Sequence, residues 1–234
     1  MTPVEAWKFT GHYPVPHLYE RYTFFVDAAT GQLLHVRNEV RSADVTGSVK
    51  GWATPAGSVC TEPLGPPARP DVPGNSPTLQ CMPNILVKIV GGESRYTDAL
   101  GNFSIPHPTP GPVTVTVSVA DGLWVRVDNF DQDGPELELR QDNVTPGGAP
   151  VNFEFNPPPD PPPHAAYSHA TAQVNAFIYV NKIHDFFASR LPAWGGLDYQ
   201  LVARPNVEDG CTSQFTFSAI EFPAEGGGCP TNAA

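Results

Sequence analysis

The sequence predicts a mainly β protein, with a β-sandwich flanked by an N-terminal β-hairpin and a C-terminal α+β fragment. Three observations support this fold class. The 234 residues include 28 Pro and 21 Gly but only 16% charged residues, which favours strands and turns over a helical bundle. Residues 113–119 alternate Val with Thr or Ser, as a strand with one buried face does. Residues 157–163 are Pro except for Asp160, so they form a stiff linker that continues neither a sheet nor a helix.

The sequence of the N-terminal region, residues 1–44, predicts a hairpin of two strands. Residues 22–26 and 32–36 are largely apolar and flank a turn. Asp27 and Gly31 lie in this turn and are residue types that accept turn geometry and positive φ. From these residues alone, an ordinary exposed hairpin is the expected structure.

Residues 45–155 are predicted to form the sandwich. The stretch from residue 84 to residue 105 is the part of the sequence on which this prediction chiefly depends. In this stretch an apolar strand, a Gly-Gly turn, a second turn and a short alternating strand follow one another, as in a small antiparallel module. Short strands at close spacing are typical of an all-β domain. The sequence further predicts a long loop at residues 55–83 and strands at residues 45–53, 113–119, 123–127, 137–139 and 151–155.

After the linker, apolar residues recur every three or four positions, which predicts an amphipathic helix over residues 172–189 that Pro192 closes. Ile178 and Phe186 lie outside the apolar stripe, so the helix is apolar over more than half of its circumference and suits the interior of a larger domain. Residues 214–222 give the one strand signal that follows. About seventy residues with one helix bury too small a core, so we expect that the last domain is cut off.

Two local pairs of cysteines predict disulfide bonds. Cys60 with Cys81 and Cys211 with Cys229 each enclose a loop rich in Gly and Pro. No Cys-x-x-Cys is present and no His lies at zinc-ligand spacing from a cysteine, so disulfides in an oxidising compartment are favoured over a zinc ribbon. Buried free thiols are the alternative, and the local pairing is one of three that four cysteines allow.

Charge and hydropathy limit the partners and the location. The formal net charge is −11 and the pI is about 4.9, so the surface repels phosphate groups, and we expect neither nucleic acid nor a membrane as a partner. No segment is long and apolar enough to span a membrane, and no signal peptide begins at Met1. Because the cysteine pattern favours an oxidising compartment, we expect a secreted protein. Without a signal peptide, we expect that Met1 is an internal start or that the true N-terminus lies upstream.

The sequence contains no established catalytic motif. It lacks His-Glu-x-x-His for zinc, Gly-x-Ser-x-Gly for a nucleophilic serine and a Gly-rich phosphate loop. His184 lies on the apolar stripe of the helix, where a core or interface histidine is expected rather than a catalytic group or a metal ligand. Residues 128–134 begin like a calcium loop, but Arg140 stands where that loop needs a bidentate Glu, so an acidic turn is expected. We therefore assign no catalytic residue, no metal ligand and no cofactor to this chain.

Three segments resemble successive parts of one type of secreted precursor. Phe-Val-Asp-Ala-Ala-Thr-Gly-Gln-Leu-Leu at residues 25–34 resembles the last hairpin of the PepSY-type propeptide domains of thermolysin-like and fungalysin-like metallopeptidases. Tyr-Thr-Asp-x-x-Gly-x-Phe-x-Ile at residues 96–105 resembles the carboxypeptidase-regulatory-like sandwich, which is transthyretin-like or Ig-like. Residues 173–187, with Asn-x-x-His-Asp before an aromatic residue, resemble the helix that opens the catalytic domain of fungalysin-like zinc metallopeptidases.

The last segment departs from this family at its substrate strand. Residues 211–232 resemble the strand and turn that stand before the zinc-binding helix, where the family has Asn-Ala-aromatic against the substrate. Thr212, Ser213 and Phe215 lie at that place, so the resemblance implies a substrate-cleft strand without the Asn contact. The zinc motif itself does not occur before Ala234, so we expect the chain to be inactive alone.

The expected function is therefore the non-catalytic N-terminal portion of a secreted zinc metalloendopeptidase, truncated before its His-Glu-x-x-His motif. For the intact parent, the resemblance implies a polypeptide substrate, contacts with its own catalytic domain, and zinc, with calcium as a further candidate. The alternative function is a stand-alone extracellular binding or adhesion module built on the sandwich. The resemblance implies a PepSY-like propeptide tail, a carboxypeptidase-regulatory-like sandwich, a Pro-rich linker and the start of a catalytic domain at residues 1–44, 45–155, 156–165 and 166–234.

Overall fold

The fold is mainly β with a C-terminal helix, as the sequence predicts, and it was obtained as a computed structural model. In the part of the chain that the structure describes, there are four sheets and one helix, α1 (Ala165–Arg190). The described residues are 5–15, 18–38, 43–54, 77–108, 111–130, 134–157, 165–207, 213–216 and 219–223.

The N-terminal sheet has three antiparallel strands in the order β1-β2-β3: β1 (Ala6–Val15), β2 (Leu18–Asp27) and β3 (Leu33–Asn38). The predicted turn lies between β2 and β3. Asp27 Oδ1 accepts hydrogen bonds from the backbone N–H groups of Ala29 and Thr30, each at 2.8 Å, and Gly31 has a φ of 72°. Sequence reasoning missed β1, which pairs with β2 along its whole length.

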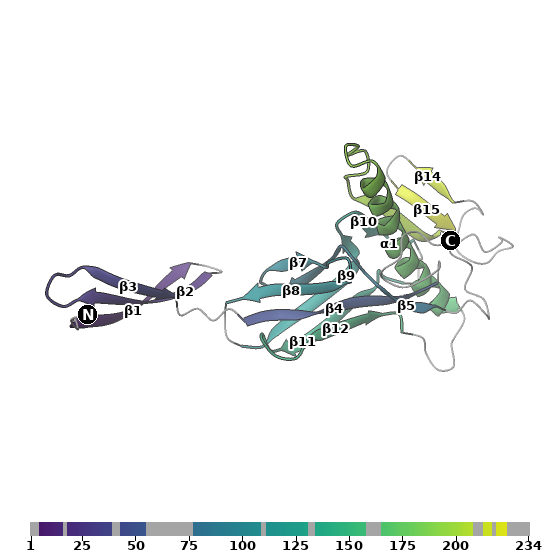
Figure 1. The fold of residues 1–234 in the computed structure, drawn as a ribbon. Helices are drawn as coiled ribbons and strands as arrows, with labels where there is room; N and C mark the ends of the chain where they lie inside the picture. Colours follow the sequence, from purple (N-terminus) through teal and green to yellow (C-terminus); the bar gives the residue numbers. More distant parts are fainter. Residues whose placement is uncertain are drawn as a thin grey trace.

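The sandwich is built from two sheets (Figure 1). The buried side chains of both sheets belong to one hydrophobic core. One sheet has the order β11-β9-β6-β7, and the other has the order β12-β4-β5, with β8 paired to the first half of β4. The strands are β4 (Ala43–Ala53), β5 (Thr78–Cys81), β6 (Ile85–Ile89), β7 (Ser94–Tyr96), β8 (Asn102–His107), β9 (Val113–Gly122), β11 (Glu138–Val144) and β12 (Val151–Phe155).

Alternation decides which side chains enter the sandwich core. In β9, Val115, Val117 and Val119 are buried, whereas the Thr and Ser residues between them are only half-buried. β6 repeats the pattern, with Ile85 and Ile89 buried at its two ends. The two strands with the clearest predicted alternation therefore pair at the centre of their sheet.

The C-terminal sheet has the order β10-β13-β15-β14 and lies against α1 (Figure 1). Its strands are β10 (Val125–Val127), β13 (Leu201–Val207), β14 (Gln214–Thr216) and β15 (Ala219–Pro223). β10, β13 and β15 run parallel, and β14 is antiparallel to β15. The sequence predicts residues 123–127 as a sandwich strand and residues 214–222 as one strand. The structure instead pairs β10 with β13 and divides the later segment into β14 and β15.

α1 shares the core of the sandwich. Val174, Phe177 and Ile178 are fully buried in one cluster with the sandwich side chains. Two glycines of the sandwich allow this close approach. A Cβ on Gly51 would lie 2.6 Å from Val174 Cγ1. A Cβ on Gly122 would lie 2.7 Å from Phe177 Cε2, so the absence of a side chain at both positions lets the helix pack directly on β4 and β9.

Amide side chains of α1 complete the hydrogen bonding at the end of the sandwich. The backbone N–H of Thr54 donates to Asn175 Oδ1 at 2.9 Å, and Asn175 Nδ2 donates to Thr54 Oγ1 at 3.0 Å. The backbone N–H of Leu137 donates to Gln173 Oε1 at 2.9 Å. Thr54 and Gln173 are buried, so these amides satisfy donors and acceptors that water reaches poorly.

Gly101→Ala tests the close packing of the β7–β8 turn on β4. Gly101 has a φ of 76°, and a Cβ there would lie 2.4 Å from the backbone oxygen of Val49. Gly91 has nearly the same φ, 75°, but nothing lies within 4 Å of its Cβ position, so Gly91→Ala is the matched control. We expect Gly91→Ala to lower the free energy of unfolding by about 1–2 kcal/mol, the cost of a left-handed backbone. We expect Gly101→Ala to lower it by about 1–3 kcal/mol more, because the backbone of β4 must move.

The measurement is the urea unfolding of both variants and of the wild-type chain, monitored by circular dichroism. Equal losses of stability in the two variants would contradict the close contact between the turn and β4.

Candidate functional site

The edge strand β14 is the first part of the candidate site. It is the outermost strand of the C-terminal sheet, and no described strand pairs with it on its outer side. Such an edge presents unpaired backbone N–H and C=O groups to which another chain can add. Phe215 in β14 is 62% exposed, and Ser213 just before the strand is also exposed, whereas Thr212 lies outside the described residues. Ser213 and Phe215, two of the predicted cleft residues, thus lie at this edge.

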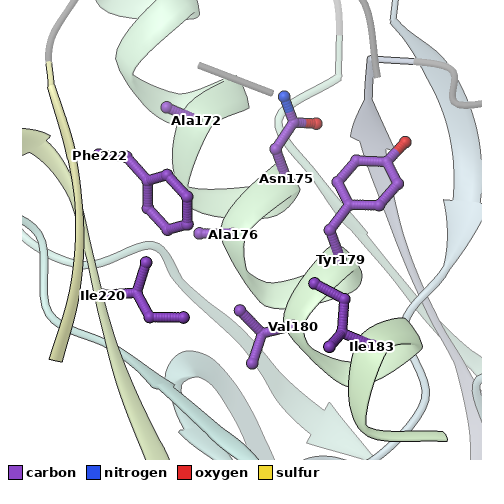
Figure 2. Close-up of a pocket in the computed structure, with 8 residues that line it drawn as sticks. All are labelled: Ala172, Asn175, Ala176, Tyr179, Val180, Ile183, Ile220 and Phe222. Atoms are coloured by element: carbon purple, nitrogen blue, oxygen red, sulfur yellow. The ribbon is translucent and has the colours of Figure 1, made fainter. Parts of the chain in front are cut away.

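An apolar groove between α1 and β15 is the second part of the candidate site. Figure 2 shows side chains from both elements around one hollow: Ala172, Asn175, Ala176, Tyr179, Val180, Ile183, Ile220 and Phe222. Its volume of about 190 Å³ gives room for about one aromatic ring. The Tyr179 hydroxyl donates to the backbone oxygen of Thr54 at 2.5 Å, so the polar end of this side chain is directed to the sandwich. The groove wall is therefore almost entirely apolar.

The side chain of Phe215 in the edge strand points to the face of the sheet on which the groove lies. Phe215 of β14 pairs directly with Ile220 of β15, and directly paired residues point to the same side. Ile220 lines the groove, so Phe215 places its ring next to the groove on the α1 side. A chain that adds to β14 would have its side chains within reach of this apolar surface.

The opposite face of the same sheet carries a charged network. Arg204 of β13 donates from Nε to Asp128 Oδ2 at 3.1 Å and from Nη1 to Glu221 Oε1 at 3.3 Å. From β14, Gln214 Nε2 donates to Glu221 Oε2 at 2.9 Å, and Thr216 Oγ1 donates to Glu221 Oε1 at 3.2 Å. The hydrogen bond from Gln214, followed by those from Thr216 and Arg204, lowers the pKa of Glu221. The hydrogen bond with Asp128 raises the pKa of Arg204.

Sequence reasoning did not predict the groove, because its two walls meet only in the folded chain. The alternation of Ile220 and Phe222 around Glu221 was the one local signal for an apolar strand face. Lys182, on the turn of α1 after Tyr179, was also missed. Its Nζ donates to Gln80 Oε1 at 3.1 Å, and burial lowers its pKa.

The structure also places the other residues that the sequence singles out. His184 is 8% exposed and stacks on Trp124, so it lies in the interface between α1 and the β9–β10 turn. Among the described residues, no group of three or more His, Cys, Asp or Glu is placed to bind a metal ion. In the acidic segment, residues 131–133 lie outside the described ranges, and Asn129 Nδ2 donates to the backbone oxygen of Gly134 at 2.7 Å.

Cys81 is the cysteine that falls within the described part of the chain. It ends β5, is buried, and is disulfide-bonded. Cys60, Cys211 and Cys229 lie outside the described residues, so the two predicted pairings stay predictions.

Comparison of the chain with protein-family models, with curated proteins and with solved structures gives no match. Within the described ranges, no helix is long and apolar enough to cross a membrane. The groove and the edge strand beside it are therefore the features of the structure that bear on function.

Glu221→Gln tests the network that holds β14 in the sheet. Because the folded state lowers the pKa of Glu221, this carboxylate stabilises the fold above its ordinary pKa of 4.5 and loses that effect as the pH falls below it. We expect Glu221→Gln to lower the urea midpoint near pH 7 and to differ much less from wild type near pH 3. Glu5→Gln, which changes one exposed carboxyl just before β1, is the control. A Glu221→Gln deficit that stays constant with pH would contradict the role of the charge.

Proposed function

We propose that this chain is the non-catalytic N-terminal portion of a secreted zinc metalloendopeptidase. The observation that carries the proposal is the apolar groove between α1 and β15, which opens beside the exposed edge strand β14. In the intact parent, the remainder of the catalytic domain covers the groove, and the edge strand helps to bind the polypeptide substrate.

The groove supports this proposal because apolar surface is left open next to a sheet. Ile183 at one end of the groove is 44% exposed, and Phe215, on the same face of the sheet, is 62% exposed. A contiguous apolar surface of this kind marks contact with further protein. In the described part of the chain, α1 is the one helix that packs on this sheet. In this proposal, further helices of the same domain cover the rest of the sheet.

The edge strand supports the choice of a polypeptide as the substrate. An extended peptide adds to an exposed sheet edge through main-chain hydrogen bonds, and neighbouring pockets then select among its side chains. β14 offers this edge, and Phe215 lies beside it. The sequence lacks His-Glu-x-x-His, so in this proposal the zinc ion, its ligands and the catalytic base belong to a part of the parent that this chain does not contain.

The N-terminal sheet supports the assignment of a propeptide tail. Trp7 pairs with Val26, Phe9 pairs with Phe24, and Phe24 pairs with Val36, so these side chains share one face. Trp7 is 62% exposed and Phe9 is 52% exposed. An apolar sheet face needs a partner surface, and a larger propeptide domain supplies one in this proposal.

A stand-alone extracellular binding or adhesion module is the second candidate function. The observation that favours it is the docking of α1 on the sandwich through Gln173 and Asn175, which makes the helix part of one core with the sandwich. In that case the groove and the edge strand bind a partner protein that is not cleaved.

The two proposed functions predict different activities for a chain that extends beyond Ala234. We expect the source transcript to encode His-Glu-x-x-His within a few tens of codons after Ala234. We expect a chain extended to the end of the encoded catalytic domain, which includes all three protein ligands of the zinc ion, to cleave casein, and a zinc chelator to abolish the cleavage, whereas the chain of 234 residues cleaves nothing. The matched control is the extended chain with the motif Glu changed to Gln, which keeps the zinc ligands but lacks the base. A stop codon directly after Ala234, or an extended chain without chelator-sensitive cleavage, would contradict the peptidase proposal.

A further inference from the structure

Lys182 lies next to the groove, on the side of α1 that faces β5 of the sandwich. Its Nζ donates to Gln80 Oε1 at 3.1 Å, and Gln80 belongs to β5. The same Nζ lies 5.1 Å from the centroid of the Tyr179 ring. Tyr179 lines the groove and stands about one helical turn before Lys182, so the ammonium group is held beside a side chain of the groove wall.

The charge of Lys182 is not paired with a carboxylate in the described part of the chain. Its hydrogen-bond partner Gln80 is a neutral amide, and burial alone lowers the pKa of the ammonium group. By contrast, Nζ of Lys88 in β6 lies 2.6 Å from Asp121 Oδ2. Lys182 is half-buried, and a cation in such a position without an opposite charge costs free energy. A carboxylate that contacts Lys182 would reduce this cost.

The groove wall beside Lys182 is uncharged (Figure 2). Its two polar side chains, Asn175 and Tyr179, both form hydrogen bonds with Thr54, so their polar atoms already have partners. A hollow of about 190 Å³ with such a wall admits one apolar side chain of about the size of an aromatic ring. A segment that covers the groove would therefore present an apolar side chain to the hollow and an acidic group to Lys182.

We propose that the groove and Lys182 together bind a polypeptide segment in which an apolar residue stands next to an Asp or a Glu. The apolar side chain fills the hollow, and the carboxylate accepts a charge-assisted hydrogen bond from Lys182 Nζ. The inference rests on the proposed function, in which the remainder of the catalytic domain covers the groove, and it assigns the chemistry of that covering segment. Gln80 and the Tyr179 ring hold the ammonium group in place before the segment binds, so little side-chain entropy is lost on binding.

A small probe tests this chemistry on the chain of 234 residues alone. Hydrocinnamate combines one aromatic ring with a carboxylate, and hydrocinnamyl alcohol has a hydroxyl group in place of the carboxylate. We expect the acid to bind about two- to fivefold more tightly than the alcohol, the preference that a partly exposed ion pair supports. The dissociation constants are measured by NMR titration, from the amide resonances of residues 172–183 and 220–222. Bound hydrocinnamate should also raise the pKa of Lys182, because a neighbouring carboxylate favours the charged form.

Lys182→Gln removes the charge and keeps a polar side chain. We expect this variant to bind the acid and the alcohol equally, and we expect Lys182→Arg, which keeps the charge, to retain the preference for the acid. Lys88→Gln is the matched control and should bind both probes as the wild type does, because Lys88 pairs with Asp121 on the sandwich. Equal affinities in the wild type, no binding of either probe, or a preference that persists in Lys182→Gln would overturn the proposal. If Lys182→Gln does not fold, the comparison of the two probes on the wild type still decides.

A chain extended to the end of the encoded catalytic domain tests the identity of the covering segment. We expect that segment to exclude hydrocinnamate and to raise the pKa of Lys182 above its value in the chain of 234 residues. An extended chain that still binds the probe has an open groove, which would contradict the assigned occupant. The two levels of the argument fail separately. A stop codon directly after Ala234 would refute the proposed function and this occupant, whereas a failed probe titration would refute the role of Lys182 alone.

Discussion

The docking of α1 on the end of the sandwich is the interaction on which the rest of the structure depends. Asn175 and Gln173 of the helix accept hydrogen bonds from the backbone N–H groups of Thr54 and Leu137. A buried N–H without an acceptor costs about 1–3 kcal/mol, so each amide matters chiefly through the donor that it satisfies. Phe177 is buried in the same interface and adds apolar area. Hydrogen bonds with fixed directions and close apolar packing together allow α1 only one orientation on the sandwich.

This orientation positions the described strands that follow α1 in the chain. One side of α1 enters the sandwich core, and another side forms the wall of the groove opposite β15. β10 follows directly after β9 of the sandwich, which ends at Gly122, and it pairs with β13. The C-terminal sheet is thus joined to the sandwich through β10. His184 lies in the same junction and links the helix to the segment that leads into β13. The sandwich is thus the support on which the groove and the edge strand are held, whichever of the two proposed functions applies.

Local patterns predicted the elements but not their partners. The alternation of residues 113–119 and 151–155 predicted β9 and β12, and Asp27 with Gly31 predicted the hairpin turn, because one-sided burial and turn chemistry are local properties. β13 was not predicted, because Pro205 interrupts its alternation. The pairing of β10 with β13 and the groove between α1 and β15 depend on segments far apart in the chain, so no single window of sequence contains them. Of the residues at the candidate site, Ser213 and Phe215 were singled out in advance, through a family resemblance rather than a physical signal.

Native-state hydrogen exchange at increasing denaturant tests most directly whether α1 and the sandwich unfold as one unit. We predict that amides of α1 near Asn175 open with the same free energy as those of β4 and β9. We also predict that Asn175→Ala lowers all three by the same amount, about 1–3 kcal/mol, because it leaves the buried N–H of Thr54 without its acceptor. If α1 opens at a much lower free energy than β9 in the wild type, or if Asn175→Ala affects α1 alone, the helix is only loosely attached and the sandwich does not position the groove.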